Sequence, residues 1–210
     1  TVTVAVVILA GLCAYGLVRY RFRGRRFLDS LIIASLMFPV FSTIIPVFQM
    51  LSAINVTDSP VGVILPQIAG NLSFAMVILM GYIRGLPVDL EESAFLEGCN
   101  VFQVFYKVIL PVCRPAFATV AIFSFLWSYN DLFTQLFFLR SPEKWTITRF
   151  LNEVSSQFGT DYGMMCAVVT LIFVPVMIVY VFLQKNIIKG LTAGAIKEKK
   201  RGSRKASSSL

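Results

Sequence analysis

Long apolar stretches alternate with short polar segments along the 210 residues of the chain. A helix that crosses a bilayer needs roughly 20 mostly apolar residues, and five stretches come close to that length. They cover residues 2–18, 31–53, 61–83, 115–139 and 163–183. Three of the five carry interior prolines, which are Pro39, Pro46, Pro66 and Pro175. Because neighbouring helices or water can satisfy the freed carbonyls, the pattern predicts an all-α membrane protein with five packed spans.

The composition supports the membrane class and narrows the chemistry. Hydrophobic residues make up 57% of the chain and charged residues only 14%, values that differ from those of soluble domains. Histidine is absent, which removes the usual general base and the commonest metal ligand. The four cysteines show no C-x-x-C spacing, and we interpret them as small apolar residues. We therefore expect no enzymatic activity, no catalytic residue, no metal site and no cofactor bound by this chain.

The basic residues predict how the spans are oriented. Segments 19–26, 84–114 and 185–205 hold all but three of the 19 lysines and arginines. Connections between spans near residues 55–60 and 141–162 hold the rest, which are Arg140, Lys144 and Arg149. Because cytoplasmic loops are enriched in basic residues, the first group and the C-terminus are predicted to be cytoplasmic. These charges lie in short loops and a tail, which argues against nucleic-acid binding. We interpret the arginine loop and the basic tail as topology determinants, with contact to anionic lipids as an additional role.

The cytoplasmic segment 87–111 is unusually acidic for a chain of this class. Asp89, Glu91 and Glu92 follow Pro87, and negative side chains stabilise the N-terminal end of a helix. Gly98 interrupts the helical pattern, which resumes over residues 101–109 with Phe102, Phe105 and Ile109 predicted on one face. The pattern predicts two short helices that meet at Gly98 on the membrane surface. A plain interfacial linker is the alternative interpretation.

The same segment resembles the cytoplasmic loop of permease subunits of bacterial ABC importers. That loop has the form E-A-A, three residues, glycine, nine residues, then I-x-L-P. The matching positions are Glu92, Ser93, Ala94, Gly98, Val108, Leu110 and Pro111, with Ser93 and Val108 as the two departures. In such permeases this loop is the coupling helix, which docks on a separate ATPase subunit.

The resemblance extends over residues 1–197 and is greatest to the maltose and glycerol-phosphate type of the carbohydrate branch. The elements FLWSYNDLF and GLTAGAIK carry it. It implies a type I importer fold with six spans, so a first span is expected to be missing from this sequence. Residues 198–210 are expected to form a disordered basic tail.

The resemblance also implies a set of partners in the cytoplasmic (inner) membrane. They are a second permease subunit, two copies of an ATPase that binds ATP and Mg²⁺, an extracytoplasmic solute-binding protein and lipids. The chain contains no G-x-x-x-x-G-K phosphate-binding motif, so hydrolysis is assigned to the partner. The residues expected to dock are Glu91, Glu92, Ser93, Ala94, Gly98, Leu110 and Pro111.

A polar element in the fourth predicted span is the candidate substrate path. A charge within the membrane is costly and often functional, and sugars suit hydroxyl-binding groups beside aromatic rings. The candidates are Trp127, Tyr129, Asn130 and Asp131. Alternatively, Asp131 lies near the outer interface or bonds a neighbouring helix.

Three rival functions remain. They are an importer for another solute, an ion-driven transporter, which would need several buried carboxylates, and a membrane scaffold without transport.

Overall fold

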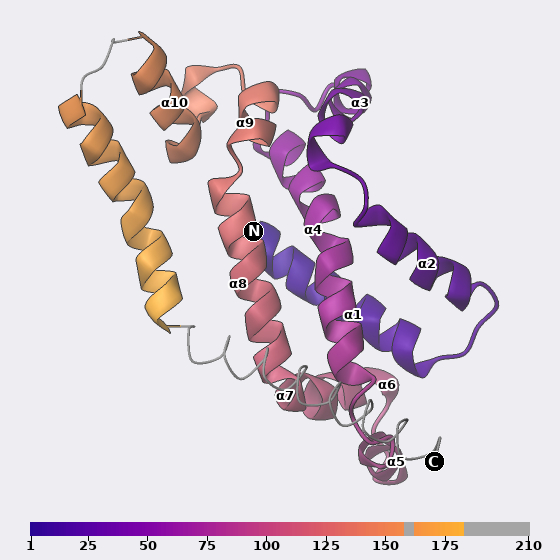
Figure 1. Cartoon of the computed structure of the whole chain (residues 1–210). Helices are drawn as coiled ribbons and strands as arrows, with labels where there is room; N and C mark the ends of the chain where they lie inside the picture. Colours follow the sequence, from indigo (N-terminus) through magenta and orange to yellow (C-terminus); the bar gives the residue numbers. More distant parts are fainter. Residues whose placement is uncertain (158–161, 183–210) are drawn as a thin grey trace, which may run out of the picture.

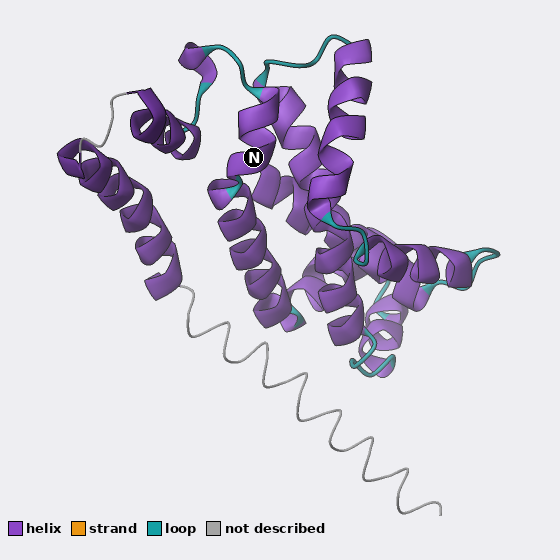
Figure 2. Cartoon of the chain, turned by 45° about the horizontal axis from the view of Figure 1, so that its top comes forward, coloured by secondary structure: helices purple, strands orange, loops and turns teal. Residues whose placement is uncertain are grey.

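The computed structural model describes residues 1–157 and 162–182, and these residues form helices joined by short turns (Figures 1 and 2). The long elements are α1 (Val2–Arg19), α2 (Arg25–Ser35), α3 (Val40–Ala53), α4 (Pro60–Ile83), α8 (Arg114–Asn130) and α10 (Ile147–Gln157). The short elements are α5 (Asp89–Leu96), α6 (Val101–Val104), the π-helical turn η1 (Phe105–Ile109), α7 (Leu110–Val112), α9 (Leu132–Phe138) and the 3₁₀ turn η2 (Pro142–Lys144). A further helix covers Tyr162–Phe182. The predicted all-α fold is confirmed.

The core lies where α1, α4 and α8 pack against one another. Small residues of α1 allow this packing, since Ala10 and Ala14 are fully buried. Gly11 makes the closest approach, because a Cβ atom there would lie 2.7 Å from the Phe117 ring of α8. The side chains of Leu79 on α4 and Val120 on α8 complete this core. The short segment that contains α5, α6 and η1 packs against the same core through Ala94, Val104 and Ile109.

Two of the predicted spans are divided in the structure. The stretch 31–53 forms parts of α2 and α3, with a break before Pro39, which is the N-cap of α3 and has an extended ψ of 128°. Proline disfavours helical geometry in the preceding residue, whereas Pro46 and Pro66 remain inside helices. The stretch 115–139 ends its first helix at Asn130, and α9 follows.

Within the described residues, three helices are long and apolar enough to cross a membrane. They are α1, α4 and Tyr162–Phe182, and the bent pair Val101–Val112 and Arg114–Asn130 is a possible fourth. The two members of that pair meet at an angle of 82°. Most side chains of Tyr162–Phe182 are exposed within this chain, and Val168 is the one that is buried.

The connecting segments gather at two opposite ends of the helices. In Figure 1, α5, α6 and α7 lie at the lower end, whereas α3, α9 and α10 lie at the upper end. The predicted basic tail and the GLTAGAIK element fall outside the described residues. Which end faces the cytoplasm stays a prediction from the basic residues.

Candidate functional site

The acidic helix α5 ends in a backbone turn that depends on Gly98. The Gly98 N–H donates to the Phe95 carbonyl and the Cys99 N–H to the Ala94 carbonyl, each at 3.0 Å. This pair of bonds defines a Schellman motif, which favours glycine at its left-handed position. Gly98 has φ +83° and would meet no atom within 4 Å of an added Cβ. The predicted meeting of two short helices at Gly98 is confirmed, and the glycine is required by its backbone conformation.

The second short helix begins with a reciprocal cap. The Gln103 N–H donates to Asn100 Oδ1 at 2.9 Å, and the Asn100 N–H donates to Gln103 Oε1 at 2.8 Å. The helix then passes into the π-helical turn Phe105–Ile109, a feature often found at functional sites. Its buried face consists of Val104, Phe105 and Ile109. The prediction that Phe102 shares this face is wrong, because Phe102 is 71% exposed.

The predicted docking residues separate into an outer and an inner group. Glu92, Ser93, Gly98, Leu110 and Pro111 are exposed. Glu91 and Ala94 are buried against the rest of the chain.

Glu91 joins α5 to the end of α1. Its carboxylate accepts a hydrogen bond from Arg19 Nε at 2.5 Å and another from the Tyr15 hydroxyl at 3.1 Å. Arg19 also donates to the Leu86 carbonyl at 3.2 Å. Only 5% of the Glu91 side chain and 13% of the Arg19 side chain are exposed. Placing Glu91 on the docking surface was therefore wrong, since its carboxylate is bound within the subunit.

Sequence reasoning missed the large apolar residues exposed around Gly98. Leu96 is 90% exposed, Phe102 71% and Tyr106 54%. These residues belong to the segment between spans, where neither the core nor a long apolar helix accounts for them. Apolar residues on either side of a glycine turn were the available signal. Large apolar residues exposed together in one segment can mark a binding surface.

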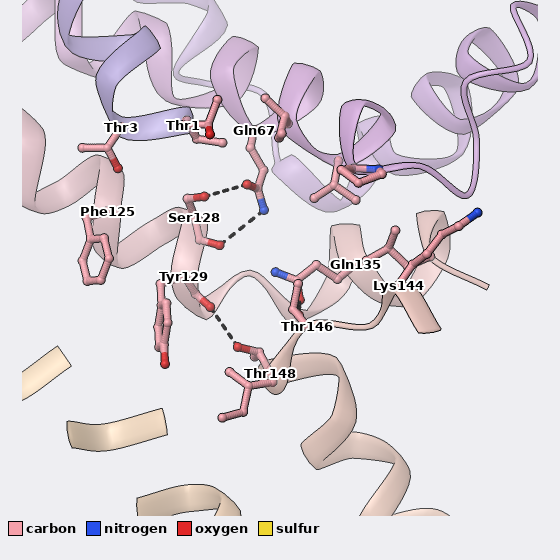
Figure 3. Close-up of a pocket in the computed structure, with 16 residues that line it drawn as sticks. Thr1, Thr3, Gln67, Phe125, Ser128, Tyr129, Gln135, Lys144, Thr146 and Thr148 are labelled. Atoms are coloured by element: carbon pink, nitrogen blue, oxygen red, sulfur yellow. Dashed lines mark hydrogen bonds between the residues drawn. The ribbon is translucent and has the colours of Figure 1, made fainter. Parts of the chain in front are cut away.

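A pocket of about 480 Å³ lies near the opposite end of the helices, between α4, α8 and the segment that precedes α10 (Figure 3). Tyr129 is the one predicted path residue that lines it. Gln67 of α4 also lines the pocket, where its Oε1 accepts from the Ser128 hydroxyl at 2.6 Å. The Tyr129 carbonyl accepts from the Thr148 hydroxyl at 2.9 Å. The lining is therefore partly polar, with amide, hydroxyl and phenol groups.

The other three candidates do not line this pocket. Trp127 packs on Phe74 with ring centroids 4.8 Å apart. Asn130 lines a smaller pocket beside the helix Tyr162–Phe182. Asp131 caps α9 by accepting from the Thr134 N–H at 3.1 Å and also accepts from Gln67 Nε2 at 2.9 Å. The four residues therefore do not form one site, and Asp131 bonds a neighbouring helix.

Two buried amides of α4 were missed from the sequence. Gln67 and Asn71 are each 7% exposed, and Asn71 Nδ2 donates to the Gln67 carbonyl at 2.7 Å. Their spacing of four residues inside an apolar run was the available signal, because it puts both on one face of a helix. In the part of the chain that the structure describes, Glu91 is the only buried carboxylate. An ion-driven transporter would need several.

A second carboxylate cluster joins the loops at the pocket end. Asp58, which has φ +55°, accepts from the N–H groups of Arg140 and Ser141 at 2.8 and 3.0 Å. It also accepts from the Ser141 hydroxyl at 2.6 Å and from Lys144 Nζ at 2.9 Å. The Ser141 bonds, with help from Lys144 and Arg140, hold the pKa of the Asp58 carboxyl well below its usual value. Asp58 therefore ties the α3–α4 loop to the segment between α9 and α10.

Comparison with known proteins places the chain in a family. Residues 7–193 match the model of the binding-protein-dependent transport system inner membrane component. The chain belongs to this family. Its members are transporter permease subunits, so the chain is a membrane protein.

Three curated relatives have names that refer to sugars. The diacetylchitobiose uptake system permease protein NgcG of Streptomyces coelicolor is 34% identical over 92% of this chain, which spans 65% of that relative. The arabinooligosaccharides transport system permease protein AraQ of Bacillus subtilis is 34% identical, with 93% and 69% covered. The trehalose transport system permease protein SugB of Mycobacterium tuberculosis is 35% identical, with 93% and 72% covered.

A solved structure has the same fold. It is the crystal structure of a bacterial ABC transporter involved in the import of the acidic polysaccharide alginate. It superposes with a TM-score of 0.76 at 24% identity and covers 88% of this chain and 69% of the other chain. The type I importer fold expected from the sequence agrees with this likeness.

Proposed function

We propose that the chain is a permease subunit of an ATP-driven importer of oligosaccharides. The observation that carries this proposal is the family match over residues 7–193 together with relatives named for sugar transport. The chain itself lacks a phosphate-binding loop, so the energy has to come from a separate ATPase. In this scheme the permease works with a second permease subunit, two ATPase copies, which bind ATP and Mg²⁺, and an extracytoplasmic solute-binding protein.

The outer surface of segment 89–112 is the proposed dock for the ATPase. It presents the exposed Glu92 and Ser93 beside the apolar side chains of Leu96 and Phe102. A groove that accepts Leu96 and Phe102 would remove a large apolar area from water, and such burial drives most protein association. A basic residue in that groove would complement Glu92. Gly98 fixes the angle between the two short helices that carry these groups.

The partly polar pocket near Gln67 and Tyr129 is the proposed contact with the sugar. Amide, hydroxyl and phenol groups line it, and these can exchange hydrogen bonds with sugar hydroxyls. Trp127 and Asp131 are not part of the proposed path, because Trp127 packs on Phe74 and Asp131 accepts from Gln67 and the Thr134 N–H. Asn130 belongs to a different pocket.

Reconstitution tests this function directly. The full-length permease is combined with its partner subunits and binding protein in liposomes, and uptake of diacetylchitobiose, trehalose and an arabinooligosaccharide is measured. ATP-dependent uptake of at least one sugar, abolished when the ATPase is omitted, is the expected result. Uptake driven by a sodium or proton gradient without the ATPase would contradict the proposal.

A further inference from the structure

We infer that the buried Arg19–Glu91 pair is a mechanical joint that makes the coupling helix α5 and the membrane helix α1 move as one body. This inference rests on the proposed function, in which α5 receives motion from an ATPase. Glu91 lies one position before the exposed Glu92. Successive residues of a helix point about 100° apart, so α5 can present one carboxylate outward and the other inward.

The geometry of the contact supports a rigid connection. Arg19 Nε lies 2.5 Å from Glu91 Oε1, and the Tyr15 hydroxyl bonds the other carboxylate oxygen at 3.1 Å. Both carboxylate oxygens are therefore held by α1. Charge-assisted hydrogen bonds of this kind are stronger than neutral ones, and most of the surface of both side chains is covered by the protein.

Aromatic packing extends the connection to the second short helix. The Tyr15 ring lies 5.5 Å from that of Phe105 in the π-helical turn, and Phe105 lies 6.4 Å from Phe117 of α8. Arg19 also binds the Leu86 carbonyl in the segment that leads into α5. The coupling segment is therefore attached to α1 at both of its short helices, while α1 packs along α4 and α8. A displacement of α5 would be transmitted to all three core helices through α1.

A loop that was only a covalent tether would behave differently. The outward group, with Glu92 and Leu96, would still bind the ATPase, but α5 could tilt without moving α1. The ATPase would then stay bound, but its ATP hydrolysis would no longer be coupled to movement of the membrane helices. The joint therefore predicts that loss of the ion pair lowers the sugar transported per ATP hydrolysed and leaves attachment of the ATPase intact.

The test uses the complete transporter with the double variant Arg19→Gln/Glu91→Gln. The double change removes both charges together, so no unpaired buried charge remains to prevent folding. The matched control is Arg21→Gln/Asp89→Asn. It also removes one positive and one negative charge, but from exposed positions two residues away from Arg19 and Glu91. Each complex is assayed for co-purified ATPase, ATP hydrolysis and uptake of the sugar that the unchanged transporter accepts.

We expect the double variant to retain the ATPase and to lose about ten-fold in sugar transported per ATP, within the usual range of coupling between sites. The control should keep the normal ratio of sugar transported to ATP hydrolysed. The exchange Arg19→Glu/Glu91→Arg should have a ratio between those of the double variant and the unchanged transporter. A normal ratio in the assembled double variant would overturn the joint. Loss of assembly or thermal stability alone, with a normal ratio in the complexes that form, would also overturn it. If the unchanged transporter shows no ATP-dependent uptake, the proposed function fails instead.

Discussion

Two carboxylates join distant parts of this chain in opposite ways. Glu91 is buried and is held by two side chains of a single helix. Asp58 is partly exposed and is held by donors from a loop, including two backbone N–H groups. Both contacts join segments more than 70 residues apart in sequence. The difference lies in what surrounds each charge.

The surroundings determine what each contact contributes. A buried ion pair gains strength from the low dielectric, but each charge depends on its partner. Exposed pairs contribute little and are screened by salt. The buried pair is therefore suited to transmit force between helices. The Asp58 cluster instead fixes the conformation of a loop, because its backbone bonds restrain the chain directly.

The largest effect is expected from removing one half of the buried pair. Arg19→Met leaves the Glu91 carboxylate buried with only Tyr15 as a side-chain donor, which should destabilise the fold by about 3–5 kcal/mol. Arg19→Met/Glu91→Leu should recover much of this loss, because both charges are gone. The denaturation midpoint of the purified transporter in detergent measures the loss in the single variant and the recovery in the double variant. A double variant less stable than Arg19→Met would show that the pair is not the source of the loss.

The turn at Gly98 should show a smaller effect in the same region. Alanine at φ +83° would adopt a left-handed conformation, which costs an L-residue about 1–2 kcal/mol. Gly70→Ala is the matched control, because Gly70 is helical, exposed and open around its Cβ. It should leave the denaturation midpoint unchanged or raise it. Equal effects of the two substitutions would argue against a backbone requirement at Gly98.

The contrast between buried and exposed carboxylates could be predicted only in part from sequence. The spacing of Glu92, Gly98 and Pro111 identified the segment and its turn. Helical periodicity did not decide whether Glu91 or Glu92 faces inward, because both residues lie in the acidic first turn of α5. That choice depends on Tyr15 and Arg19, which lie more than 70 residues earlier.

Hydropathy located the spans better than their breaks. The stretches 2–18 and 61–83 correspond closely to α1 and α4. The break before Pro39 lies among the apolar residues Leu36, Met37 and Phe38, so it leaves no trace in hydropathy. The presence of a proline did not by itself predict a break, since Pro46 and Pro66 do not break their helices.

Asp131 is a carboxylate of intermediate exposure and tests the same contrast. Asp131→Ala removes the N-cap of α9 and the bond from Gln67, so the loss should be about 1 kcal/mol or more. Asp131→Asn keeps a good N-cap residue and should be nearly neutral. The denaturation midpoints and the uptake of both variants are compared. A large loss of uptake in a fully stable Asn variant would return Asp131 to the substrate path.

Removing the charge of Asp58 should have a smaller effect than removing Arg19. Asparagine tolerates a positive φ and can still accept from the N–H groups of Arg140 and Ser141. Asp58→Asn therefore tests the charge alone, whereas Asp58→Ala also adds backbone strain. We expect the Ala variant to have the lower denaturation midpoint and to show more proteolysis between residues 139 and 146. Equal midpoints would mean that the backbone bonds contribute nothing measurable.

The smallest effects should come from changes of pH and salt at the Asp58 cluster. Its hydrogen bonds lower the pKa of Asp58 in the folded protein, so their stabilisation is fully present above the ordinary aspartate pKa of about 3.9. It is lost only as the pH falls below that value towards the folded pKa. The difference in midpoint between the unchanged protein and Asp58→Asn should therefore stay constant from about pH 5 to pH 8. A midpoint difference that changed between about pH 5 and pH 8 would mean that the hydrogen bonds to Asp58 do not hold its pKa low. Added salt should reduce the stabilising contribution of Lys144, which is exposed, but not that of Arg19.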